Sequence, residues 1–246
     1  MTFADHFSAV AKTYATYRPT YPPALVDLLA ERAPHGTAWD VGCGSGQLSV
    51  ALAAKFPRVI ATDPAAAQLA AAAHAPGVEY RRVPAEASGL PAASIALVVC
   101  AQSAHWFDWP AFLAEAARVA APGALIALVS YGNCVIEGAD INAIVARYYH
   151  DDVGAFWPHG RVHVENGYRD LNLPWPAVEA PPLAMTASWS RDELFGYLTT
   201  WSATQKRIEA IGPGALEIVQ AALAARWPDG ERRELHWPLT IKLARR

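Results

Sequence analysis

The stretch "AWDVGCGSGQLSVALA", residues 38–53, decides the fold because it joins three patterns. It opens as a short apolar run, continues through glycines at positions 42, 44 and 46, and ends in an alanine- and leucine-rich segment typical of a helix. A strand, a glycine turn and a helix in this order are typical of the first βα unit of an open parallel sheet. Glycine allows a tight turn and a close approach of a ligand to the backbone. The stretch therefore predicts a ligand site at the first turn of an α/β sheet.

Apolar runs and helical stretches alternate through the first half of the chain. Near-continuous apolar runs of this kind are typical of parallel strands that are buried on both faces. The runs occupy residues 38–42, 58–63, 78–83, 95–101 and 124–130. With two later strands, they predict a Rossmann-like α/β fold: a seven-stranded, mostly parallel sheet with helices on both faces and a small helical and loop cap.

The pattern changes after Ser130, and we interpret this as a cap within one domain, residues 1–246. Alanine content predicts a helix over 64–76, and Ser190 with a following acid predicts the N-cap of a helix over 190–210. The segment 156–168 reads as a loop. The predicted parts are an N-terminal lid and helix (1–35), a ligand-binding core (36–131), cap insertions (132–182 and 190–230) and final strands (183–189 and 235–244).

Composition excludes several classes of protein. The chain has 20 basic and 23 acidic residues, a net charge of −3 and no block of like charge, so we expect neither nucleic acid nor membrane as a partner. The N-terminus lacks the basic and apolar regions of a signal peptide. Cys43, Cys100 and Cys134 are odd in number and widely spaced, which favours reduced thiols in a cytoplasmic protein. Monomer and homodimer both stay open.

The glycine spacing distinguishes between two cofactors. Dinucleotide sites favour G-x-G-x-x-G, whereas this loop is G-x-G-x-G, with Gln47 where the third glycine would fall. Asp40 suits a ligand that carries an ammonium group, and Asp63 ends the second strand, where a carboxylate can bind ribose hydroxyls. Both features favour S-adenosylmethionine, with S-adenosylhomocysteine as product. A nicotinamide oxidoreductase and a non-catalytic cofactor-binding protein remain as alternatives.

The motifs "WDVGCGSG", "ATDP", "VPAEASGLP" and "CAQSAHWFD" follow in the order and spacing of class I S-adenosylmethionine-dependent methyltransferases. The chain most resembles the small-molecule subgroup that includes trans-aconitate methyltransferase-like (methyltransferase type 11) proteins. The resemblance implies that Asp63 binds the ribose, that Ala85 and Glu86 face the adenine, and that Gln102 lies near the methyl group. The full set of cofactor-binding residues that we expect is Tyr17, Arg18, Asp40, Gly42, Cys43, Gly44, Gly46, Asp63, Pro64, Ala85, Glu86 and Gln102.

Other candidate residues lie beyond the cofactor. His105 follows the fourth strand, where a general base would be useful, although a structural histidine is the alternative. Tyr14 and Trp106 are candidates to contact the acceptor, and core packing is the alternative for Trp106. Arg18 is a candidate to bind the methionine carboxylate or an acidic substrate, or to pin the N-terminal arm. We expect the segment 14–22 to be a lid.

The predicted reaction is methyl transfer to a small-molecule acceptor by in-line displacement, in a pocket between core and cap. Two observations limit the kind of site and the kind of acceptor. The motif "HGRVH" at 159–163 has no nearby cysteine and no HExxH helix, so we predict no metal. No N/D-P-P-Y/F motif follows the fourth strand, which argues against amino-group methylation of DNA bases. Neither the acceptor nor the methylated atom follows from the sequence.

Overall fold

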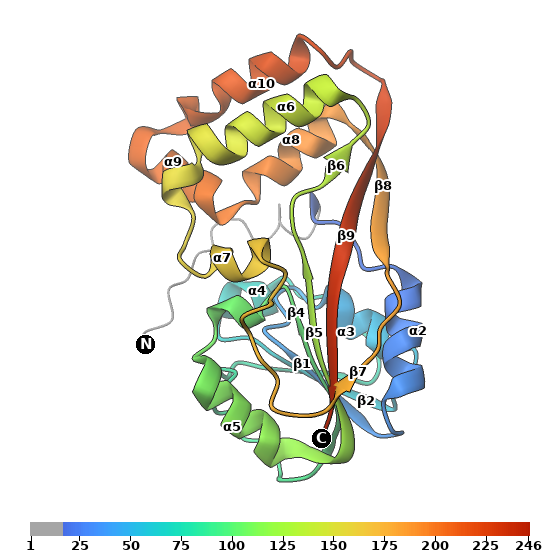
Figure 1. Cartoon of the computed structure of the whole chain (residues 1–246). Helices are drawn as coiled ribbons and strands as arrows, with labels where there is room; N and C mark the ends of the chain where they lie inside the picture. Colours follow the sequence, from blue (N-terminus) through green and yellow to red (C-terminus); the bar gives the residue numbers. More distant parts are fainter. Residues whose placement is uncertain (1–16) are drawn as a thin grey trace.

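The computed structural model describes residues 17–246, and the first half of this range forms a parallel sheet (Figure 1). Its strands lie in the order β3-β2-β1-β4-β5, so the order reverses between β1 and β4. In open parallel sheets, ligands bind beyond the carboxyl ends of the strands at such a reversal. The five strands are β1 (Thr37–Val41), β2 (Arg58–Thr62), β3 (Val78–Arg81), β4 (Ile95–Ala101) and β5 (Ala120–Tyr131).

Helices cover both faces of this sheet. On one face, Leu25 and Leu29 of α2 and Leu52 of α3 are fully buried. On the other face, Phe112 of α5 is buried near Trp39 of β1. Burial on both faces explains why the strands are apolar without alternation. The helical elements of this part of the chain are α2 (Pro23–Arg32), which precedes β1, and α3 (Gln47–Leu52), α4 (Ala66–Ala70), η2 (Ala104–Trp106) and α5 (Trp109–Val119).

The last strand, β9 (Arg232–Arg245), connects the core to the cap. Its second half pairs antiparallel with β5, from Leu239 opposite Tyr131 to Arg245 opposite Leu125. Its first half continues beyond the parallel sheet and pairs with β8 (Ala184–Ser190). Figure 1 shows this strand in red, running from the core sheet to the level of the cap helices. The cap is therefore built on an extension of the same sheet.

The cap has an apolar core of its own. Aromatic side chains dominate it, and Tyr148, Tyr197, Trp201, Trp227 and Trp237 are all buried there. The tryptophans of the second half of the chain thus mostly stabilise the cap. Its helical elements are α6 (Ala139–Arg147), η3 (Tyr148–Asp152), η4 (Gly154–Phe156), α8 (Arg191–Thr199), α9 (Ser202–Ile211), η5 (Pro213–Leu216) and α10 (Glu217–Ala224).

The α/β fold with a mostly parallel sheet and helices on both faces is confirmed, but the sheet has nine strands and not seven. The two additional strands are β6 (Val135–Ile136) and β7 (Ala177–Val178). Each has two residues, which is too short for any periodic pattern to reveal. Both pair with β9 and extend the antiparallel side of the sheet.

Three local predictions need correction. The helix predicted over 64–76 is only α4, five residues long, because helical propensity alone supports short helices weakly. The helix predicted over 190–210 begins as expected, with a capping box between Ser190 and Glu193, but it breaks into α8 and α9 at Trp201. The segment predicted as a loop over 156–168 contains the short helix α7 (Arg161–Glu165).

The predicted cap insertion 132–182 divides in two. Its first part joins the cap core through Ile141, Val145 and Tyr149. Its second part returns to the parallel sheet, where Val164 and Tyr168 are buried in the same cluster as α5. Figure 1 shows α7 between the cap helices and the sheet. Within residues 17–246, no helix is long and apolar enough to cross a membrane.

Candidate active site

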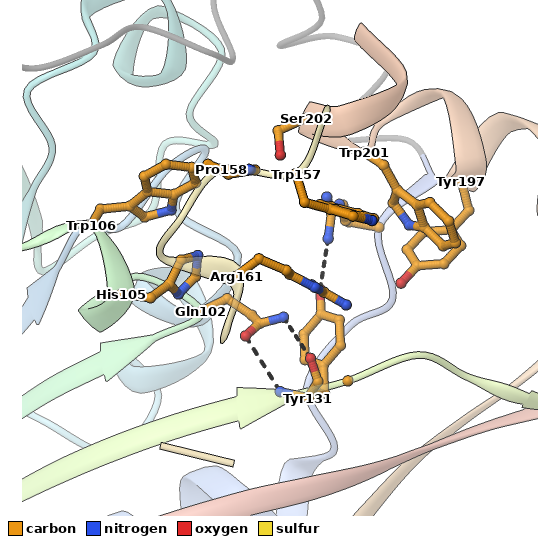
Figure 2. A pocket seen from close by; sticks show the side chains of 12 residues that line it. Gln102, His105, Trp106, Tyr131, Trp157, Pro158, Arg161, Tyr197, Trp201 and Ser202 are labelled. Carbon is orange, nitrogen blue, oxygen red and sulfur yellow. Dashed lines mark hydrogen bonds between the residues drawn. The ribbon is translucent and has the colours of Figure 1, made fainter. Parts of the chain in front are cut away.

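Two pockets meet beyond the carboxyl ends of β1, β4 and β5. The glycine-loop pocket is lined by Tyr21, Asp40, Gly42, Cys43, Gly44, Ser45, Gln47, Leu48, Ala101, Gln102 and Tyr131. The aromatic pocket is lined by Arg18, Gln102, His105, Trp106, Tyr131, Gly132, Trp157, Pro158, Arg161, Tyr197, Trp201 and Ser202, and Figure 2 shows it from close by. Gln102 and Tyr131 line both pockets, so they form a shared wall.

The three positions of the loop require glycine for different structural reasons. All have positive φ angles, of 68°, 54° and 78° for Gly42, Gly44 and Gly46. A Cβ on Gly42 would lie 2.5 Å from Cβ of Ser103, and a Cβ on Gly46 would overlap the hydroxyl of Tyr80. A Cβ on Gly44 would meet only Gln68 Oε1, at 3.7 Å. Packing within the protein therefore requires Gly42 and Gly46, whereas Gly44 leaves space beside the pocket.

Asp63 holds the glycine loop in place. One carboxylate oxygen accepts a hydrogen bond from the backbone N–H of Gly44 at 2.9 Å, and the other accepts one from Ala65 N at 2.8 Å. A carboxylate can accept about four hydrogen bonds, so these contacts leave acceptor capacity for a ligand. Asp63 thus has a structural task in addition to the ribose contact that its position at the end of β2 predicts.

Asp40 is a buried carboxyl group in the lining of the glycine-loop pocket. It accepts a hydrogen bond from Ser49 Oγ at 2.6 Å. Its pKa is raised to about 7, mainly by burial; the hydrogen bond from Ser49 opposes the shift, and the charge of Asp63 adds to it. A cation bound in this pocket would favour the ionised form. The site is therefore suited to a positively charged ligand.

Gln102 fixes the boundary between the pockets. Its φ of 54° is uncommon for a residue other than glycine and marks a sharp turn directly after β4. Its side-chain Nε2 donates to the carbonyl of Tyr131 at 2.9 Å, and its Oε1 accepts from the backbone N–H of Tyr131 at 3.4 Å (Figure 2). Its Oε1 also accepts from Ser130 Oγ at 3.0 Å. The end of β4 is thus tied to the end of β5. A strained residue that several contacts hold in place is typical of a functional site.

Several predicted cofactor residues lie elsewhere. Cys43 is in the glycine-loop pocket, and burial raises the pKa of its thiol. Other predicted residues are outside the lining of that pocket, namely Gly46, Asp63, Pro64, Ala85 and Glu86. Glu86 accepts a hydrogen bond from the N–H of Asp108 at 2.8 Å. This contact fastens the turn before α5.

The N-terminal candidates also differ from their predicted positions. Tyr17 packs its ring against Gly196 of α8 and belongs to the cap core. Arg18 lines the aromatic pocket and not the glycine-loop pocket, which instead receives Tyr21. Tyr14 lies outside the described residues. Of the predicted set, Asp40, Gly42, Cys43, Gly44 and Gln102 come together in the glycine-loop pocket.

His105 follows β4 and lines the aromatic pocket, but its environment is poor for a general base. Its Nδ1 lies 2.8 Å from the hydroxyl of the buried Tyr168. Its pKa is lowered to about 3, mainly by burial and also by the positive charges of Arg161, His163 and Arg18. An imidazole with such a pKa is neutral at pH 7 and a weak proton acceptor. The structural alternative, an orienting histidine held by Tyr168, fits these contacts better.

Sequence reasoning missed most of the aromatic pocket. Tyr131 ends β5, and the strand-end rule that selected Gln102 would also have selected it. Trp157, Tyr197 and Trp201 come from parts of the chain far from the fourth strand in sequence, and no motif marks them. Arg161 is part of the motif "HGRVH", which we considered only as a possible metal site. In the described part of the chain, no group of three or more His, Cys, Asp and Glu side chains could hold a metal ion.

Comparisons with known proteins agree with this geometry. Residues 39–128 match the family described as methyltransferase domain. A solved structure from Anaeromyxobacter dehalogenans, named provisionally as a type II methyltransferase, is 45% identical with a TM-score of 0.84, and the match covers 93% of this chain and 98% of that one. A Dictyostelium discoideum protein with a provisional methyltransferase name is 29% identical over 252 residues, which is 99% of this chain and 96% of that protein.

The fold also resembles that of more distant enzymes. A methyltransferase from Thiobacillus denitrificans, solved with S-adenosylhomocysteine, matches over the whole of both chains with 14% identity and a TM-score of 0.50. The chain belongs to the class I S-adenosylmethionine-dependent methyltransferases, and S-adenosylmethionine is its cofactor. The alternative of a nicotinamide oxidoreductase is therefore wrong. The narrower resemblance to trans-aconitate methyltransferase-like proteins stays a prediction.

Proposed function

We propose that this protein transfers a methyl group from S-adenosylmethionine in the glycine-loop pocket to a small-molecule acceptor in the aromatic pocket. The observation that carries the proposal is the shared wall: Gln102 and Tyr131 line both pockets. In-line displacement needs the acceptor atom, the methyl carbon and the sulfur in one line. Two neighbouring pockets on either side of one wall support that alignment.

The residues of the glycine-loop pocket fit this cofactor. The bound cofactor supplies an activated methyl group on a positively charged sulfur and an amino-acid end with an ammonium group. Asp40 offers a buried carboxylate for that positive charge, and the absence of a Cβ on Gly44 lets the ligand approach the backbone. We assign the ribose to Asp63, and the adenine to the loop that holds Ala85 and Glu86. These assignments rest on the order of the strands and on the family resemblance.

The segment that leads into α2 contributes to both pockets. Arg18 donates to the carbonyl of Thr200 at 3.2 Å and to the hydroxyl of Tyr131 at 3.4 Å. Three residues later, the ring of Tyr21 lies against that of Tyr131, with centroids 6.2 Å apart. These contacts support the proposal that residues 14–22 form a lid that excludes water from the transfer.

We retain three further predictions with this function. The acceptor is not a nucleic acid, and the protein acts in the cytoplasm. Cys43, Cys100 and Cys134 are free thiols, which suits a reducing compartment. The protein is a monomer or a homodimer.

Two measurements test the proposed function. Isothermal titration with S-adenosylhomocysteine should give one site per chain in the wild type and no measurable site in Gly44→Val. Transfer of a labelled methyl group should then be screened across carboxylates, phenols and amines. Binding without transfer to any acceptor would favour the non-catalytic alternative. Equal affinity of the wild type and Gly44→Val for S-adenosylhomocysteine would show that the cofactor does not bind at this loop.

A further inference from the structure

The aromatic pocket has an uneven distribution of charge. Arg18 and Arg161 both line it, whereas the described residues of its lining include no Asp or Glu. Flat apolar side chains form much of the remaining wall, among them Trp106, Trp157 and Trp201. Figure 2 shows Arg161 pointing into the middle of this set. Such a wall suits a flat, largely apolar ligand that carries negative charge.

Arg161 is held in one orientation by neutral partners. Its Nε donates to the hydroxyl of Tyr149 at 2.7 Å, and its Nη2 donates to Asn133 Oδ1 at 3.1 Å. Its guanidinium carbon lies 4.6 Å from the ring centroid of Trp157. Among the described residues, no hydrogen-bond partner contacts the third nitrogen, Nη1. A guanidinium fixed in this way presents ready donors to an anion with little further loss of side-chain entropy.

The nearest carboxylate does not cancel this charge. Glu165 lies 3.9 Å from Nε of Arg161 and is about half exposed, with a side-chain exposure of 47%. It also accepts a hydrogen bond from the hydroxyl of Tyr149. The Arg161 side chain is only 16% exposed, but water reaches the half-exposed Glu165 and screens this long contact. The guanidinium thus keeps most of its field on the pocket side.

The same two arginines act on His105, which lines the same pocket. The pKa of His105 is lowered first by burial and then by the charges of Arg161, His163 and Arg18. Those charges disfavour a proton on the imidazole for the same reason that they favour an anion nearby. His163 is outside the lining of the pocket and faces Asp170, whose Oδ2 lies 2.6 Å from its Nδ1. Of these positive groups, the two arginines are the ones that line the pocket.

We infer that the methyl acceptor is a flat, apolar molecule that carries an anionic oxygen group, and that Arg161 binds that group. The inference rests on the proposed function, because it assigns the aromatic pocket to the acceptor. Arg161 and Arg18 recognise the anion, while the indoles of Trp106 and Trp157 contact the apolar body. A carboxylate and a phosphate share the required chemistry.

The test compares acids with neutral molecules of the same shape. The probes are benzoate with benzamide, trans-cinnamate with trans-cinnamamide, and indole-3-acetate with indole-3-acetamide. Affinities are measured by ligand-observed NMR, with and without saturating S-adenosylhomocysteine. We expect at least one acid to bind about tenfold more tightly than its amide. We also expect this preference to weaken between 50 and 500 mM NaCl, because salt screens the charge. Phenyl phosphate against benzoate distinguishes the two kinds of anion.

Two variants assign the effect to the residue. Arg161→Gln should remove the preference for the acid, whereas Arg58→Gln, an exposed arginine at the start of β2, should keep it. Thermal unfolding of both variants checks that they fold. Equal affinity for acid and amide in every pair, including failure of any acid to bind, would overturn the inference. So would an acid preference that survives Arg161→Gln or is insensitive to salt in the wild type. Loss of S-adenosylhomocysteine binding alone would count against the proposed function instead.

Discussion

The glycine-loop pocket and the aromatic pocket share a wall but have opposite charge. The first contains the buried Asp40 beside a loop that Asp63 holds, and the second contains Arg18 and Arg161. The first includes two glycines, Gly42 and Gly44, whereas the second includes three tryptophans, Trp106, Trp157 and Trp201. A cationic donor and an anionic acceptor would each find a complementary environment. The charges thus favour the cationic donor in the glycine-loop pocket and an anionic acceptor in the aromatic pocket.

The largest expected effect is on the glycine-loop side. In Gly44→Val, the new side chain stands at a positive φ and enters the space that we assign to the cofactor. Isothermal titration should show loss of S-adenosylhomocysteine binding, with a loss of stability of about 1–2 kcal/mol from the backbone conformation alone. Gly46→Ala is the matched control, because its Cβ also stands at a positive φ but meets the hydroxyl end of the half-buried Tyr80. That variant should lose more stability than Gly44→Val, because the Tyr80 side chain must shift. The reverse order of stabilities would contradict these roles.

The second effect concerns Asp63, which we expect to serve both fold and ligand. Asp63→Ala removes the acceptors for the N–H groups of Gly44 and Ala65, and charge-assisted bonds of this type contribute roughly 1.5–3 kcal/mol each. Cofactor affinity should fall at least about tenfold, and the unliganded protein should also unfold at a lower temperature. Calorimetry measures both. If Asp63→Ala binds the cofactor more weakly but unfolds at the same temperature, Asp63 serves the ribose contact and does not stabilise the fold.

The two pockets also differ in how far the sequence predicts them. Gly42, Gly44 and Asp40 fall within five residues, so a local pattern was enough to find them. The capping box at Ser190 was found for the same reason. Arg161 reaches the aromatic pocket because the chain returns from the cap toward the sheet, and Trp201 lines the pocket from the cap core. No local pattern carries that information. The same limit applies to β6 and β7, whose pairing with β9 depends on distant residues.

The stability of the protein should depend on pH through Asp40 in the glycine-loop pocket, whereas the arginines of the aromatic pocket stay charged. Its pKa rises from 3.8 to about 7 on folding, so the folded state holds this proton more tightly than the unfolded chain. The stability that this group contributes is fully present below about pH 4 and is lost as the pH rises through about 7. Asp40→Asn should therefore be more stable than the wild type at pH 8, by at most about 4 kcal/mol, and nearly equal to it near pH 4. Denaturant unfolding across this range measures the difference.

The same substitution should weaken binding of S-adenosylmethionine, because the neutral amide cannot attract a cation. A wild type whose stability, relative to Asp40→Asn, does not change with pH would mean that Asp40 stays ionised. In that case the attraction to the cofactor would persist at low pH as well. Titration of the cofactor at pH 5.5 and 8 distinguishes the two outcomes, since only a carboxyl group that titrates near pH 7 makes the affinity rise with pH.

The smallest effect is expected at His105, on the aromatic side. Its low pKa leaves it neutral throughout the range in which the protein would work, and Tyr168 holds its Nδ1. If the acceptor already carries an anionic oxygen, the transfer needs no proton acceptor from the protein. His105→Asn should then keep the turnover number within about threefold of the wild type, with an unchanged pH profile. General-base catalysis typically contributes roughly 10²–10⁴-fold. A fall of that size, with loss of an acidic limb in the profile, would restore His105 as the base and point to an acceptor that must lose a proton.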